Sequence, residues 1–228
     1  MSRFFTIQKL IQRGRQRCDQ ENRDILSAAE WQAELSTVWG EFRGIIVESG
    51  TRYFESSETF DTVSGQRDYP LPTDYMATIG VDYDGTDDIS YELPELLAQE
   101  RNLYRTGAGS RPAAYALIGQ NIRLYPTPST VETFTHVYAP QAPDISEATV
   151  TDALDVITPD GESFLIWSLA LIGGIKEESD QVVTYARQME SARKRLEKWA
   201  QNRSLHTPKR RYTSDPADFR RDPADWRY

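Results

Sequence analysis

An apolar run followed directly by a long helical pattern, over residues 161–203, constrains this fold more than any other stretch. In its first half, apolar side chains occur nearly all round the helix, which is typical of a helix covered by its neighbours. The run is shorter than the roughly 20 residues that a membrane span requires. We predict a core helix that Gly173 and Gly174 loosen at its end, and we expect truncation to be most damaging at Trp167 and Leu171. Its apolar residues are Phe164, Leu165, Ile166, Trp167, Leu169, Ala170, Leu171, Ile172 and Ile175.

The second half of this stretch predicts an amphipathic helix that Ser179 caps at its N-terminus. Its other face carries cations in the later turns, where they suit the helix dipole. The apolar positions are Val182, Tyr185, Ala186, Met189, Leu196 and Trp199, and the basic ones are Arg187, Arg193, Lys194, Arg195, Lys198 and Arg203.

Two further helices are expected near the N-terminus. Residues 6–18 place aliphatic side chains on one face and Arg13, Arg15 and Arg17 on the other, where we expect them to be simply solvated. Ser27 and Glu30 form a capping box, after which apolar residues recur at alternating steps of four and three as far as residue 48. Two helices at each end of the chain predict a bundle closed by both termini, with the middle inserted as a separate layer.

The middle of the chain changes to aromatic and β-branched residues punctuated by Gly, Pro and Asp, which is typical of strands. We expect strands at residues 53–60, around Tyr69, and at 76–83, 114–118, 122–125 and 134–138, with a short helix at 94–105. Asp84 and Gly85 form an expected hairpin tip, and residues 141–159 a connection into the core helix.

These patterns predict an α+β fold: a helical bundle built from N- and C-terminal helices, a mostly antiparallel β insertion, and an extended C-terminal arm. The expected divisions are 1–50 for the N-terminal helices, 51–158 for the insertion, 159–204 for the C-terminal helices and 205–228 for the arm.

The arm contains an internal repeat, in which Asp-Pro-Ala-Asp, an aromatic residue and Arg occur at 215–220 and again at 222–227. Each copy begins with Asp as a cap and Pro at the first helical position, so each can form one turn that presents a ring and a guanidinium. Such side chains dominate the hot spots of protein interfaces. We predict that the arm docks on a partner or on neighbouring copies through Tyr212, Phe219, Arg220, Arg221, Trp226 and Arg227.

Charge and cysteine content exclude several classes of protein. The formal net charge of -9 argues against a nucleic-acid binder that neutralises phosphates. One cysteine, Cys18, excludes an intrachain disulfide, and arginines follow Met1 too soon for a secretory signal, so we expect synthesis in a cytoplasm.

No motif in the sequence indicates an enzyme, a cofactor or a metal site. There is no Gly-x-Ser-x-Gly elbow, phosphate loop, His-Glu-x-x-His or cysteine pair. His136 lies in a predicted strand and His206 opens the arm, so packing or solvent exposure explains both better than catalysis. Four aspartates around Gly85 lack the twelfth-position glutamate of a calcium loop and are expected to form a solvated hairpin tip. These are Asp82, Asp84, Asp87 and Asp88.

Three short motifs, in their order along the chain, resemble tailed-phage head-to-tail adaptor proteins, the rings beneath the portal. They are a Leu-Pro-x-Asp-Tyr turn at 71–75, an Arg-Pro-x-x-Tyr strand entry at 111–115 and an Arg-Leu-Tyr-Pro-x-Pro strand exit at 123–128. Leu103 and Tyr104 lie between the first two, a helical pair follows, and the likeness spans residues 53–203. The repeat in the arm matches no motif of the family.

The resemblance implies a structural virion protein rather than an enzyme. It implies a helical bundle with a β insertion, assembled as a ring, commonly of twelve copies, with its arm docked on the portal and its lower face receiving tail, nozzle or tube proteins. Genomic DNA would pass through the ring without sequence-specific binding, which a negative body favours because it repels phosphates. Two alternatives stay open, a carboxylate-dependent cell-wall hydrolase associated with a phage tail and a free-standing peptide-binding module.

Contacts between copies in a ring are expected to be heterologous, because one patch must meet a different patch for the ring to close. Oppositely charged helical faces are available for this role. We predict that Arg187, Arg193 and Lys194 of one copy meet Glu34 and Glu41 of the next.

Overall fold

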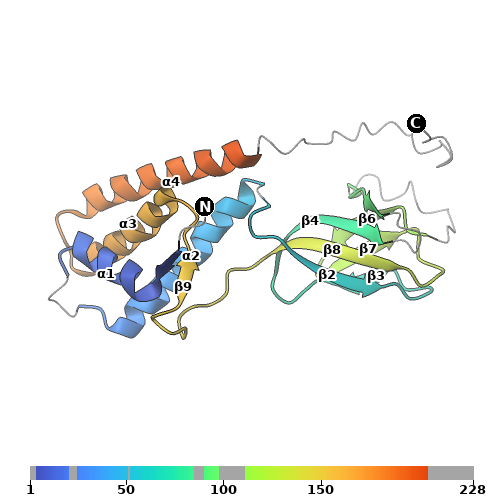
Figure 1. Ribbon diagram of the computed structural model, residues 1–228, viewed down its shortest axis with the longest axis horizontal. Helices are drawn as coiled ribbons and strands as arrows, with labels where there is room; N and C mark the ends of the chain where they lie inside the picture. The colour runs from blue at the N-terminus through green and yellow to red at the C-terminus, as the bar shows by residue number, and fades with distance from the viewer. Residues whose placement is uncertain (1–3, 21–24, 51, 85–89, 98–110, 205–228) are drawn as a thin grey trace.

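The computed structural model describes residues 4–20, 25–50, 52–84, 90–97 and 111–204. Within these residues the chain is α+β, as predicted. Figure 1 shows the helices gathered at one end of an elongated molecule and the strands from β2 (Ser56–Asp61) to β8 (Thr133–Pro140) at the other. We call these two parts the bundle and the sheet lobe.

The bundle contains the predicted helices: α1 (Ile7–Arg17), α2 (Ala28–Glu48), α3 (Pro159–Lys176) and α4 (Val182–Ser204). The capping box at α2 is confirmed, because Ser27 N donates to Glu30 Oε2 at 2.7 Å and Glu30 N donates to Ser27 Oγ at 3.3 Å. Thr158 caps α3 by accepting from Gly161 N at 3.0 Å. Ser179 lies further from α4 than predicted: the helix begins at Val182, and the Ser179 hydroxyl accepts from the preceding turn at Gln181 N.

Helix α3 lies at the centre of the bundle core and contacts α1, α2 and α4. Its innermost residues are Phe164, Leu165 and Leu169, which are fully buried. Trp167 and Leu171 are only half-buried and pack on the margin of this core, so the prediction that they lie at its most critical point is wrong. Trp167 packs between α4 and α1, and its ring centroid lies 6.3 Å from that of Tyr185 on α4. The Arg17 guanidinium of α1 covers the same ring, 5.1 Å from its centre.

Gly173 and Gly174 allow close helix packing and do not loosen the end of α3, which continues to Lys176. A Cβ added to Gly173 would lie 2.7 Å from Trp31 Cη2, and one added to Gly174 would lie 2.8 Å from the Tyr185 ring. Real Cβ atoms do not approach this closely. The two glycines therefore let α3 approach α2 on one side and α4 on the other.

The sheet lobe consists, in the described residues, of two antiparallel sheets. The four-stranded sheet has the order β2-β8-β4-β5 and the three-stranded sheet the order β3-β7-β6. Rings and aliphatic side chains from both sheets form a second core, among them Tyr69, Val81, Tyr115, Leu124 and Phe134. The strands are β2 (Ser56–Asp61), β3 (Asp68–Pro70), β4 (Tyr75–Asp84), β5 (Ser90–Leu93), β6 (Ala114–Ile118), β7 (Asn121–Tyr125) and β8 (Thr133–Pro140).

Each predicted strand is present, but the predicted helix at 94–105 is wrong where the structure describes it. There the chain is extended: Tyr115 N donates to Pro94 O at 3.1 Å and Leu96 N donates to Tyr115 O at 2.7 Å. Residues 98–105 lie outside the described part. Burial of Leu96 and these cross-sheet hydrogen bonds outweigh the local helical preference.

The predicted connection at 141–159 also holds a strand that the sequence reading missed. β9 (Ala153–Asp155) pairs antiparallel with β1 (Phe4–Thr6). Buried Gln32 of α2 holds the same connection by donating from Nε2 to Ile145 O at 2.9 Å. The connection therefore packs against the bundle, and Leu154 of β9 belongs to the bundle core.

Candidate assembly surfaces

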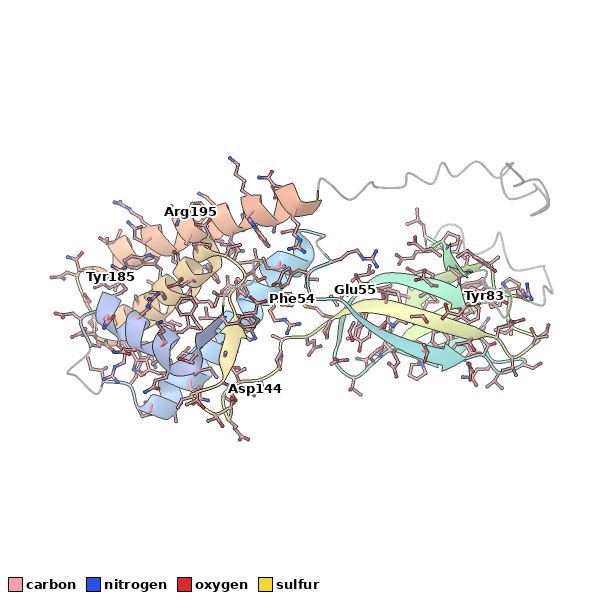
Figure 2. The ribbon with its side chains drawn as sticks, in the orientation of Figure 1. Phe54, Glu55, Tyr83, Asp144, Tyr185 and Arg195 are labelled. Carbon is pink, nitrogen blue, oxygen red and sulfur yellow. The ribbon has the colours of Figure 1, made fainter. Side chains whose placement is uncertain are left out.

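The junction between the bundle and the sheet lobe is built around Arg43 of α2. Its guanidinium donates from Nη2 to Pro140 O at the end of β8, at 3.3 Å, and lies 4.2 Å from the Phe54 ring centre. Figure 2 shows Phe54 at this junction. Burial lowers the pKa of Arg43 below its ordinary value, while nearby Asp74 acts in the opposite direction. A largely desolvated cation thus links the helix, the linker after it and the last long strand.

A second contact fixes the place where the C-terminal arm begins. The Arg203 guanidinium, in the last turn of α4, lies 4.8 Å from the Tyr53 ring centre and 5.8 Å from that of Trp199. Tyr53 in turn donates its hydroxyl to Asp155 Oδ2 at 2.5 Å. The end of α4 is therefore held beside the linker that leads into β2.

Sequence reading missed Arg43, Tyr53 and Arg203 as junction residues. Arg43 offered a weak signal, since it is a cation directly after Phe42 in an otherwise apolar stretch of α2. Tyr53 and Arg203 offered none, because their contact joins residues far apart in the chain.

Two of the five residues predicted to pair between subunits also pair with each other within one chain. Arg193 Nη1 of α4 lies 3.1 Å from Glu41 Oε1 of α2, and Arg193 Nε lies 3.0 Å from Glu197 Oε1. Both partners of the Arg193–Glu41 pair are substantially exposed, so it contributes little to stability. Lys194 makes only an exposed helical pair with Glu190 at 3.4 Å. Arg187 is exposed and Glu34 half-buried.

The basic face of α1, predicted to be solvated, is partly used inside the bundle. Arg13 forms an ion pair with the buried carboxylate of Glu162 on α3, and Arg17 covers Trp167. A groove of about 550 Å³ lies beside these residues, and another of about 500 Å³ lies between α1 and the start of α2. The second groove is lined by Gln8, Ile11, Gln12, Arg15, Ala28, Trp31 and Val150.

His136 is packed in the sheet lobe, as predicted. It is 1% exposed, its Nε2 lies 3.1 Å from Thr78 Oγ1, and its ring stacks on Tyr138 with the centroids 5.1 Å apart. Burial lowers the pKa of His136 to about 4, which keeps the imidazole neutral at physiological pH. His206 lies outside the described residues.

The acidic residues at the end of β4 form a polar sheet face. Asp82 and Asp84 alternate with the buried Val81 and Tyr83, and Thr135 of the neighbouring strand donates to Asp84. Burial, then the nearby Asp84, raises the pKa of Asp82. Across the described residues, no three His, Cys, Asp or Glu side chains group in a way that could hold a metal ion. Asp87 and Asp88 lie outside the described part.

The predicted docking residues of the arm cannot be placed, because residues 205–228 lie outside the described part of the chain. These residues are Tyr212, Phe219, Arg220, Arg221, Trp226 and Arg227. The structure describes only the anchor from which the arm departs, at Arg203.

The bundle, the sheet lobe and their junction together correspond to one known family. The family model described as the SU10 adaptor protein matches residues 5–213. The chain belongs to this family. It is a family of phage head-to-tail adaptor proteins, so the chain is a bacteriophage virion protein of a structural family, with portal and tail proteins as the general partners of such adaptors.

The match covers both lobes and continues beyond α4, and it confirms the resemblance carried by the three short motifs. A comparison with the curated proteins found no match. None of the helices among the described residues has the length and hydrophobicity to cross a membrane.

Proposed function

We propose that this adaptor assembles as a ring of about twelve copies beneath the portal and joins the capsid to the tail around the DNA channel. The observation that carries the proposal is the family match across both lobes and their junction. The buried Arg43 at the junction supports it, because a ring that connects portal to tail requires the bundle and the sheet lobe of each copy to be held together. The net charge of -9 suits a channel through which DNA slides.

In this proposal the ring contacts are heterologous and involve the charged faces of α4 and α2. Arg187, Arg193 and Lys194 of one copy face Glu34 and Glu41 of the next. Exposure of Arg187 and Lys194 supports this arrangement. Arg193 and Glu41, which pair with each other within one chain, would each pair instead with the same partner residue on the neighbouring copy.

The C-terminal arm docks on the portal through its two Asp-Pro-Ala-Asp-aromatic-Arg units. Each unit offers one ring and one guanidinium, and linking two of them raises the effective concentration of the second. The family match ends at residue 213, before the first unit. The repeat is therefore the part of the arm best suited to recognise one particular portal, while the lower face of the ring receives tail, nozzle or tube proteins.

We also propose that the divisions 1–50, 51–158, 159–204 and 205–228 act as the functional units of the chain, assembled in the host cytoplasm. The presence of two separate hydrophobic clusters supports a distinction between bundle and sheet lobe. Residues Ile145, Leu154 and Val156 contribute to the bundle cluster, so the core specific to the insertion is made by the strands β2 to β8.

The deciding experiment mixes the purified full chain with purified portal and measures the mass of the complex by native mass spectrometry, followed by electron microscopy. We expect about twelve copies on each portal, arranged as a ring. A chain that stays monomeric and unbound at micromolar portal would overturn the proposal. Hydrolysis of cell-wall glycan by the same preparation would favour the hydrolase alternative.

A further inference from the structure

Within the part of the lobe that the structure describes, backbone hydrogen bonds join the two sheets along one side only. There, residues after β5 pair with β6 through the parallel bridge between Glu95 and Tyr115. On the opposite side β2 and β3 are the edge strands, and only side chains join them, with the Phe60 and Tyr69 ring centroids 5.0 Å apart. Among the described residues, the outer edge of β2 has no backbone partner.

Of these two edges, β2 is the one suited to accept another strand. β3 has three residues and includes Pro70, which cannot donate to a ladder and protects an edge against pairing. β2 has six residues, no proline, and an unshifted register with β8 from Ser56 to Asp61. Ser57, Glu58 and Thr59 are exposed. A regular edge of this length is a template for β-strand addition.

The chain itself supplies a segment close to this edge. Arg203 is held against Tyr53, and β2 begins at Ser56, three residues further on. Figure 1 shows the C-terminal end of α4 above the point where α2 gives way to β2. The last turn of α4 is therefore held at the linker that leads into β2.

The sequence of that segment complements the edge. Residues 209–213 read Lys-Arg-Arg-Tyr-Thr, and Tyr and Thr favour strands. Lys209, Arg210 and Arg211 would run along the first part of an edge that carries the exposed carboxylates of Glu55 and Glu58. The family match passes α4 and ends at residue 213, so it includes this segment and leaves out the repeat. Residues 205–208 can span roughly 13 Å at about 3.3 Å per residue.

We propose that residues 209–213 add to the β2 edge of their own chain as a fifth, parallel strand of the four-stranded sheet. Backbone hydrogen bonds would hold the added strand to β2, and the opposite charges would fix its register. The short tether would give the segment a high effective concentration at this edge. The repeat at 215–227 would then leave from the far end of β2, beside Val63. This inference does not depend on ring assembly or portal binding, and it is tested on the isolated chain.

The test is amide hydrogen exchange of β2, measured residue by residue by NMR on the full chain. Successive amides of a strand point to opposite sides, so either Arg211 or Tyr212 must donate toward β2. We expect one of the two proline variants, Arg211→Pro or Tyr212→Pro, to speed exchange of the β2 amides that point away from β8 about tenfold or more. The triple variant Lys209→Glu, Arg210→Glu, Arg211→Glu should have the same effect. Trp226→Pro, the same change outside the segment, should leave these rates unchanged.

Two results would overturn the inference. Equal β2 exchange in the parent and in all three segment variants would show that no strand pairs with this edge. Protection of β2 that rises with protein concentration would place the segment on a neighbouring copy instead of its own chain. Portal binding is measured separately, so a failure here leaves the docking of the repeat untouched.

Discussion

The Arg43 guanidinium stacks on the Phe54 ring at 4.2 Å while it donates to the carbonyl of Pro140, so one side chain joins the bundle to the sheet lobe. Arg43→Ala removes the hydrogen bond, the cation–π contact and the packing of the stem, and should cost about 1–3 kcal/mol. The lobes should also lose their fixed relative orientation. Denaturant unfolding and small-angle X-ray scattering measure the two effects. Arg52→Ala, at an exposed ion pair with Glu55, should cost less than about 1 kcal/mol.

A pair of leucines on α3 tests where the bundle core lies. Leu169 is fully buried and Leu171 only half-buried, although the two differ little in the sequence pattern. Leu169→Ala should cost about 3–5 kcal/mol, because it leaves a cavity inside the core, and Leu171→Ala less than half of that. Chemical denaturation provides both values. Equal costs would mean that α3 is rotated relative to its neighbours.

Two glycine substitutions should have opposite signs. Gly173→Ala places a Cβ 2.7 Å from Trp31 Cη2 and should destabilise the bundle by about 1–3 kcal/mol through overpacking. At Gly40, inside α2, a Cβ meets nothing within 4 Å, so Gly40→Ala should stabilise by about 0.5–1 kcal/mol. The melting temperature should fall for Gly173→Ala and rise for Gly40→Ala. A shift of both melting temperatures in the same direction would contradict the close approach of α3 to α2.

His136 should make the protein less stable in mild acid. Its pKa is about 4 in the folded chain and near 6.5 when unfolded, so the unfolded state binds the proton first. The contribution of neutral His136 to the free energy of unfolding is fully present above pH 6.5 and is lost as the pH falls from 6.5 to 4. Between pH 7 and pH 5 the parent should lose about 1–2 kcal/mol more than His136→Phe does. Denaturant titrations at the two pH values measure this difference, and identical pH slopes would contradict a buried neutral imidazole.

Much of the fold could be predicted because its signals are local. The Ser27–Glu30 capping box lies within four consecutive residues, and the β6–β7 hairpin has its turn at Gly119 between two short apolar runs. The errors come from distant contacts. The role of Gly173 depends on Trp31, and the extended conformation at Pro94 depends on Tyr115. No local pattern carries such information, because an isolated helical propensity is too weak to resist tertiary hydrogen bonds.

The candidate assembly surfaces were predicted less completely than the fold, for the same reason. Charged faces of α2 and α4 are visible as periodic patterns, but only the structure brings Arg193 and Glu41 together within one chain. The junction residues Arg43 and Arg203 had no local motif, since each acts through a ring supplied by the linker between α2 and β2.

Deleting residues 215–228 should leave a folded adaptor that no longer binds the portal. All described elements of the bundle and the sheet lobe lie before this point, so the melting temperature should stay close to that of the full chain. Phe219→Ala combined with Trp226→Ala should weaken portal binding nearly as much, because the two rings are the hot-spot side chains of the linked units, and losing both removes their avidity. Either single variant should retain intermediate affinity. Val183→Ala, an exposed apolar residue on α4, is the matched control and should bind normally. Binding is measured by surface plasmon resonance on immobilised portal, where undiminished affinity of the deletion variant would show that the repeat is not the docking element.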